Sequence, residues 1–70
     1  MKVHIGQAIE HVVREQGRSP SWLAGQLHCA RTNIYKIFKR ESIDTALLQR
    51  TSDVLDFDFF HLFVEDKDGL

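Results

Sequence analysis

The stretch SPSWLAGQLHCARTNIYKIFKR, residues 19–40, constrains the fold of this chain most, because it reads as two short helices joined by a tight turn. Ser19 is a favourable helix N-cap, and Pro20 takes the first helical position, where a missing backbone N–H costs nothing. Leu23 and Leu27 then fall on one face at helical spacing. The pattern predicts a helix that begins at Pro20 and buries this face.

A second helix is predicted after the turn at residues 28–30. Ile34, Ile37 and Phe38 recur at the spacing of a buried helical stripe. The outward positions of a helix over residues 31–40 are Arg31, Thr32, Asn33, Tyr35, Lys36, Lys39 and Arg40, with Asn33 at the edge of the set.

The outward face of this second helix has the composition of a nucleic-acid reader. Residues 31–40 hold four cations and no acid, and the side chains between the cations can hydrogen-bond to base edges or phosphates. An α-helix fits the major groove of B-DNA, where Arg pairs with guanine and Asn with adenine. A solvated charged face is the other interpretation of such a run, and the run alone does not separate the two.

Composition is that of an ordinary globular chain, with 43% hydrophobic and 27% charged residues and no apolar run of bilayer length. A length of 70 residues predicts one domain that buries roughly 60% of the surface of its unfolded chain. Residues 1–5 show no signal-peptide pattern, and a single cysteine, Cys29, forms no internal disulfide, so a cytoplasmic protein is expected, with Cys29 as a small buried hydrophobe. The four His and one Cys lack the paired spacing of zinc ligands, so neither a metal nor a cofactor is predicted.

Charge is distributed unevenly along the chain. Residues 1–50 hold eight Lys and Arg against four acids, a balance of +4, whereas residues 51–70 hold one Lys against six acids, a balance of −5, which together give the net charge of −1. Binding to DNA depends on the local patch within about a Debye length, ~10 Å. The uneven distribution therefore leaves DNA binding open despite the acidic total.

Three further helices are predicted around this pair. The opening one ends at Gly17 as a C′ glycine, the fourth begins after Asp44 as N-cap, and Asp58 caps a short last one. Arg50 on the fourth helix projects outward, as a phosphate contact or a partner for Asp53. The five predicted helices cover residues 4–16, 20–27, 31–40, 44–55 and 58–63, and the tail over residues 64–70 is expected to fray.

The segment 56–63 contains four Phe and a Leu, more apolar bulk than a small core needs. Phe57 and Phe60 are predicted in the core, whereas the remaining three would form an exposed apolar patch that marks a homodimer interface. That predicted interface consists of Phe59, Leu62 and Phe63. The alternative is that all of these side chains close the bottom of the helical core.

The segment LAxxLxxxRTNIYKIF, which begins at Leu23, resembles the helix-turn-helix of the phage repressor and Cro family, and the resemblance extends over residues 5–63. It implies an all-α, five-helix repressor-like domain whose second motif helix enters the major groove, usually as a dimer on a two-fold site. By similarity, base contacts would fall on Arg31, Thr32 and Lys36. His28 stands where the turn of this family commonly has Gly, so a positive φ is expected there.

Two functions of different class follow from these observations. The first is a sequence-specific regulator that binds double-stranded DNA as a homodimer. Its base-facing residues would be Arg31, Thr32, Asn33, Tyr35 and Lys36, and its phosphate-facing residues Ser19, Ser21, Lys39 and Arg40. The second is a protein-interaction module that holds a partner protein with the Phe-rich, acidic C-terminal end. No catalytic constellation or phosphate-binding glycine loop is recognisable, so an enzyme is not expected.

Overall fold

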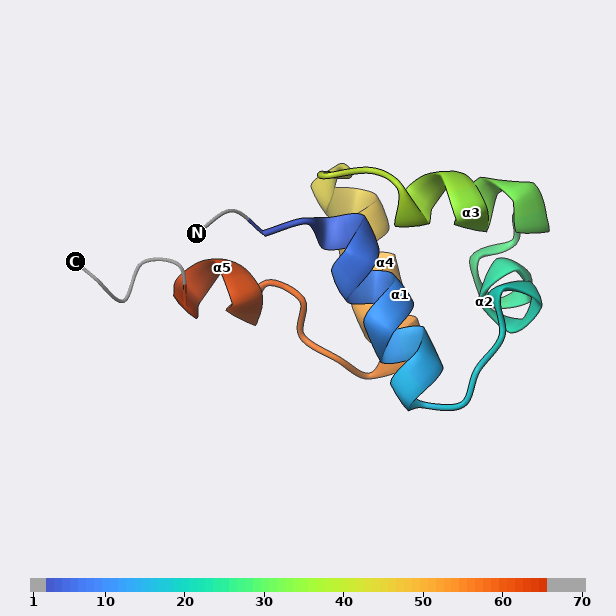
Figure 1. Ribbon diagram of the computed structural model, residues 1–70, viewed down its shortest axis with the longest axis horizontal. Helices are drawn as coiled ribbons and strands as arrows, with labels where there is room; N and C mark the ends of the chain where they lie inside the picture. Colours follow the sequence, from blue (N-terminus) through green and yellow to red (C-terminus); the bar gives the residue numbers. More distant parts are fainter. Residues whose placement is uncertain (1–2, 66–70) are drawn as a thin grey trace.

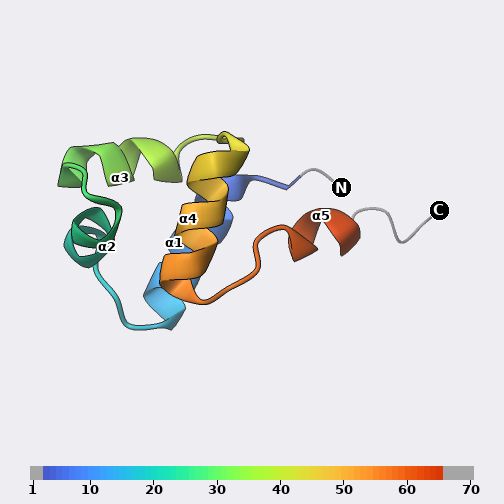
Figure 2. The same ribbon diagram turned by 180° about the vertical axis from the view of Figure 1, so that it is seen from behind.

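Residues 3–65, which the computed structural model describes, form five α-helices and no strand, as the sequence predicts (Figure 1). The helices are α1 (Ile5–Glu15), α2 (Pro20–Leu27), α3 (Arg31–Phe38), α4 (Thr45–Leu55) and α5 (His61–Glu65). α1 packs against α3 and α4, and α2 packs against α3 and α4. α5 projects away from these four helices in both views (Figures 1 and 2).

Three helices begin with a side chain that accepts a hydrogen bond from their first turn. The Ser19 hydroxyl accepts from the Trp22 N–H at 3.1 Å, and the Asp44 carboxylate accepts from the Leu47 N–H at 2.7 Å. Both predicted N-caps are confirmed. His4, predicted as the first helical residue, instead caps α1, because its Nδ1 accepts from the backbone N–H three residues later at 3.1 Å.

The predicted ends of two helices are wrong. α3 ends at Phe38, two residues before the predicted end. α5 begins at His61, three residues after Asp58. The Asp58 carboxylate accepts from the Phe60 N–H at 3.0 Å and so forms a turn rather than a helical cap. α5 runs to Glu65, although residues 64 and 65 were predicted in a frayed tail. The rest of that tail, residues 66–70, lies outside the described residues.

The turn between α2 and α3 requires a left-handed residue, and His28 provides it with φ 57° and ψ 46°. The Cys29 N–H donates to the Ala24 carbonyl at 3.0 Å and so closes the end of α2. The positive φ expected from the sequence is confirmed. Cys29 itself is half-buried rather than fully buried.

Replacing His28 with Gly is expected to raise the free energy of unfolding by about 0.5 kcal/mol, because Gly adopts the left-handed conformation without the Cβ penalty but loses more chain entropy on folding. Urea unfolding followed by circular dichroism measures this change. Gly17→Ala is the opposite substitution at another residue with positive φ, 70°. It is expected to lower the free energy of unfolding by about 1 kcal/mol. A destabilised His28→Gly variant would contradict the strain in this turn.

The hydrophobic core joins all four packed helices and the loop after α4. The fully buried side chains of largest volume include Ile5, Ile9, Leu23, Ile34, Leu55 and Phe59. Burial of such side chains contributes roughly 1.5–3 kcal/mol each. Among residues 3–65, no helix is both long and apolar enough to cross a membrane.

The Phe-rich segment places its side chains differently from the prediction. Phe59 is 0% exposed and belongs to the core, whereas Phe57 is 38% exposed. The reason is the turn at the end of α4, where Asp56 adopts φ 52° and the Phe57 N–H donates to the Ser52 carbonyl at 3.1 Å. This turn reverses the chain, directs Phe59 inward and leaves Phe57 at the surface. Phe59 is therefore removed from the predicted dimer interface.

α1 begins directly on the end of α3. The Ile5 N–H donates to the Glu41 carbonyl and the Gly6 N–H to the Arg40 carbonyl, each at 2.9 Å. A Cβ at position 6 would collide with the backbone carbonyl oxygens of Ile37, Phe38 and Arg40. Two N–H groups of the first turn of α1, which have no partner within the helix, thus donate to carbonyls just after the end of α3, and Gly6 allows the close approach. This contact fixes α3 relative to α1.

Candidate nucleic-acid interface

α3 separates its buried stripe from its polar face as the sequence predicts. Ile34, Ile37 and Phe38 are buried in the core. All the side chains predicted to face outward are exposed, namely Arg31, Thr32, Asn33, Tyr35, Lys36, Lys39 and Arg40. The described structure thus leaves every predicted residue of this stretch accessible to a ligand.

The exposed face of α3 has a centre and two flanks. Thr32, Lys36 and Lys39 follow the i, i+4, i+7 spacing and form the centre, directly opposite the buried stripe. Tyr35 lies on the flank next to α1, where its ring meets the Phe38 ring edge to face with centroids 6.3 Å apart. Asn33 lies on the other flank, next to α4.

The start of α2 adds polar groups beside the Tyr35 flank. Ser19 and Ser21 are exposed, and Ser19 shares a shallow hollow with Tyr35. Sequence reasoning missed Arg18, whose guanidinium lies 4.3 Å from the centroid of the Trp22 ring. This cation–π contact holds an exposed positive charge next to Ser19. The four-residue spacing of Arg18 and Trp22 was the available signal.

The Glu10 carboxylate lies close to the Tyr35 flank and is already paired. Glu10 shares the hollows beside Tyr35, and its Oε2 accepts from the Arg14 Nη2 at 2.8 Å. An exposed i, i+4 pair of this kind contributes little to stability. It does balance the negative charge of Glu10 next to the exposed face of α3.

Arg50 does not pair with Asp53, which was one of its two predicted roles. The Arg50 Nη2 donates to the Leu27 carbonyl at the end of α2, at 3.0 Å. The Asp53 carboxylate accepts instead from the Gln49 amide at 3.0 Å. Arg50 is therefore anchored on the α2 to α3 turn, a contact over 23 residues that no sequence pattern signals.

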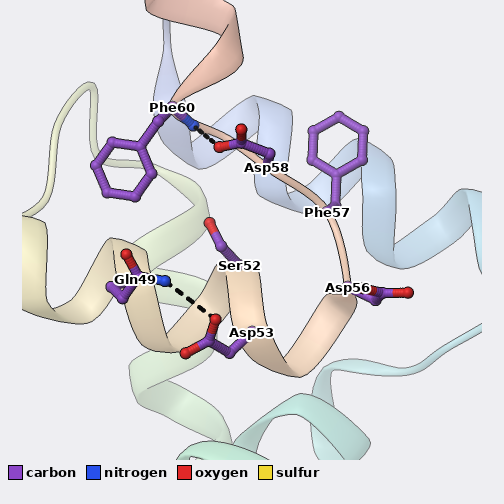
Figure 3. Close-up of a pocket in the computed structure, with 7 residues that line it drawn as sticks. All are labelled: Gln49, Ser52, Asp53, Asp56, Phe57, Asp58 and Phe60. Carbon is purple, nitrogen blue, oxygen red and sulfur yellow. Dashed lines mark hydrogen bonds between the residues drawn. The ribbon is translucent and has the colours of Figure 1, made fainter.

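The acidic end of the chain forms a separate hollow beside α4 (Figure 3). Its carboxylates are those of Asp53, Asp56 and Asp58, and the rings of Phe57 and Phe60 belong to the same lining. In Figure 3 the segment after α4 runs back along that helix and carries both rings. The hollow combines negative charge with an exposed aromatic side chain.

The predicted dimer residues on α5 differ in exposure. Phe63 is 41% exposed, whereas Leu62 is partly buried against the core. Within residues 3–65, no group of three or more His, Cys, Asp or Glu side chains is placed to hold a metal ion.

Comparisons with protein-family models, curated proteins and solved structures found no match to this chain. A functional proposal therefore depends on the geometry of α3 and its surroundings.

Proposed function

We propose that this chain is a sequence-specific double-stranded DNA-binding regulator that inserts α3 into the major groove. The observation that carries the proposal is the exposed polar surface of α3 and of the two residues after it. Residues 31–40 present four cations and three uncharged hydrogen-bonding side chains, contain no carboxylate, and are held by the buried stripe of α3. Cations neutralise phosphates, and the uncharged side chains between them can reach base edges. A DNA regulator of this kind would act in the cytoplasm, where Cys29 stays reduced.

The proposed roles follow position on the face. The base-facing set is Arg31, Thr32, Asn33, Tyr35 and Lys36, and the phosphate-facing set is Ser19, Ser21, Lys39 and Arg40. α2 would lie across the backbone while the first turns of α3 approach the bases, which is the docking geometry of helix-turn-helix proteins. The positions of Ser19 and Tyr35 around one hollow support this division, because they put a backbone-facing group next to a base-facing one.

Selection from a randomised duplex pool, followed by sequencing of the retained duplexes, tests the proposal. The wild-type chain is expected to enrich a short motif, and a variant with Arg31→Glu and Lys36→Glu is expected to lose the enrichment because two cations of the face become acids. Equal behaviour of the two proteins in the pool would overturn the proposal.

Arg31→Ala is expected to weaken binding to the selected duplex by about 1–3 kcal/mol and to relax the choice of one base, because a bidentate Arg contact discriminates between base pairs. Fluorescence anisotropy with single-base variants of the duplex measures both effects. Lys39→Ala is the control for a phosphate contact. It is expected to lower the affinity equally for all duplexes and to reduce the magnitude of the slope of log K against log salt concentration, the salt slope, by about one. A uniform loss in Arg31→Ala would assign Arg31 to a phosphate instead.

We also propose that the chain binds DNA as a homodimer through α5. Phe63 is exposed on a helix of five residues that projects from the core, and an apolar side chain in that position commonly marks an association site. Phe63→Asp is expected to give a folded monomer whose affinity for a palindromic duplex falls on the order of 100-fold. Sedimentation equilibrium measures the oligomeric state, and a dimer that survives the substitution would place the interface elsewhere.

A protein-interaction module is the second candidate function. It is favoured by the hollow of three carboxylates with the exposed Phe57 ring, which offers charge and apolar surface to a basic partner segment (Figure 3). The duplex selection separates the two candidates, since this module would enrich no motif. Under this second function, Asp53→Asn would weaken the complex with the partner and leave any DNA affinity unchanged.

A further inference from the structure

A groove between α3 and α4 gathers three cations that are distant in the sequence. Its polar lining consists of Asn33, Lys36, Arg40 and Arg50, and its other lining side chains bring no carboxylate. Arg50 enters this set only through the tertiary structure, because it follows Arg40 by a loop and half of α4. Three positive charges with no carboxylate in the groove lining attract an anion to this groove.

One of the cations is held in place before any ligand arrives, and the backbone of a second is fixed. Arg50 is anchored by the hydrogen bond from its Nη2 to the Leu27 carbonyl at 3.0 Å. A guanidinium carries five N–H donors, so most of its fork stays available for a second acceptor. Arg40 is fixed through its backbone, since its carbonyl accepts from the Gly6 N–H at 2.9 Å. The entropy cost of ordering the Arg50 guanidinium on binding is thereby reduced.

The groove and the Ser19 region lie on opposite flanks of α3. Asn33 lines the groove, whereas Tyr35 lines the hollow that contains Ser19, and residues two apart on a helix face opposite sides. A helix in the major groove has one DNA strand on each side. The polar groups on the two flanks of α3 are therefore placed to contact the phosphate backbones of the two DNA strands.

We propose that the groove binds a backbone phosphate of duplex DNA, with Arg50 and Arg40 as a cationic clamp and the Asn33 amide as a third donor. The proposal rests on the function proposed above and adds α4 to the interface. It moves Asn33 from the bases to the backbone, while Lys36, where the groove meets the centre of the exposed face, keeps its base-facing role. The ligand is a phosphodiester, which binds a guanidinium fork with two parallel hydrogen bonds.

The test compares Arg50→Gln with the wild type by fluorescence anisotropy, on the selected duplex and on a random duplex, over a series of salt concentrations. Gln49→Glu is the matched control. It lowers the net charge by the same amount on the adjacent residue of α4, but position 49 lines the acidic hollow instead of the groove (Figure 3). Arg50→Lys retains the charge without the fork, and thermal melting of each variant checks that it is folded.

Arg50→Gln is expected to lower the affinity for both duplexes equally, by about tenfold, and to reduce the magnitude of the salt slope by about one. Gln49→Glu is expected to leave the slope unchanged, and Arg50→Lys to retain the wild-type slope. If folded Arg50→Gln binds both duplexes with the wild-type affinity and slope, the groove proposal fails while DNA binding stands. If the wild type binds neither duplex, the proposed function itself fails. A groove that binds inorganic phosphate while Arg50→Gln binds DNA normally would also overturn the assignment to the backbone.

Discussion

Replacing Phe59 with Ala is expected to lower the free energy of unfolding by about 4 kcal/mol, the cost of removing a buried ring and leaving a cavity. Phe59 is fully buried, and its ring lies 4.8 Å from the Phe57 ring, centroid to centroid. A domain of 70 residues has roughly 4–10 kcal/mol of stability in total. The Phe59→Ala substitution would therefore remove a large fraction of the total stability and lower the urea midpoint of unfolding, which urea titration by circular dichroism measures.

Phe63→Ala is the matched control for this prediction, because it removes the same side chain from an exposed position. Its expected effect on the unfolding of the monomer is within about 0.5 kcal/mol. Equal losses in the two variants would contradict the burial of Phe59 in the core.

Replacing Gly6 with Ala is expected to lower the free energy of unfolding by about 3 kcal/mol, because the added methyl group would meet three backbone carbonyl oxygens in the last turn of α3 and in the residues just after it. Backbone atoms cannot rotate away as a flexible side chain can, so α1 and α3 must separate. Separation also strains the hydrogen bonds from the N–H groups of Ile5 and Gly6. Chemical unfolding measures the loss.

Gly25→Ala is the control for Gly6→Ala. Gly25 is exposed within α2, and nothing lies near the position that its Cβ would take. Ala has a higher helix propensity than Gly, so this substitution is expected to stabilise the chain by about 0.5–1 kcal/mol. Opposite signs for the two glycines are the expected result, and a stabilised Gly6→Ala variant would contradict the close junction of α1 and α3.

The sequence alone predicted the helices and the polar face of α3, because these features depend on local chemistry. Ser19 and Asp44 accept hydrogen bonds from nearby N–H groups of the first helical turn, and Ile34, Ile37 and Phe38 define a buried stripe by their spacing. His28 took its positive φ from the geometry of the turn that ends α2. Each of these decisions involves residues within a few positions of one another.

Only the tertiary structure decided which distant groups meet. Gly6 against the end of α3, Arg50 on the Leu27 carbonyl and Phe59 in the core all depend on how separate helices pack. Alternation of exposed and buried Phe in the segment after α4 depends on one left-handed residue, Asp56, which reverses the chain. A local pattern predicts which face of a helix is apolar, but the partner that covers that face is selected by the packing of the whole core, so these contacts had no signal in the sequence.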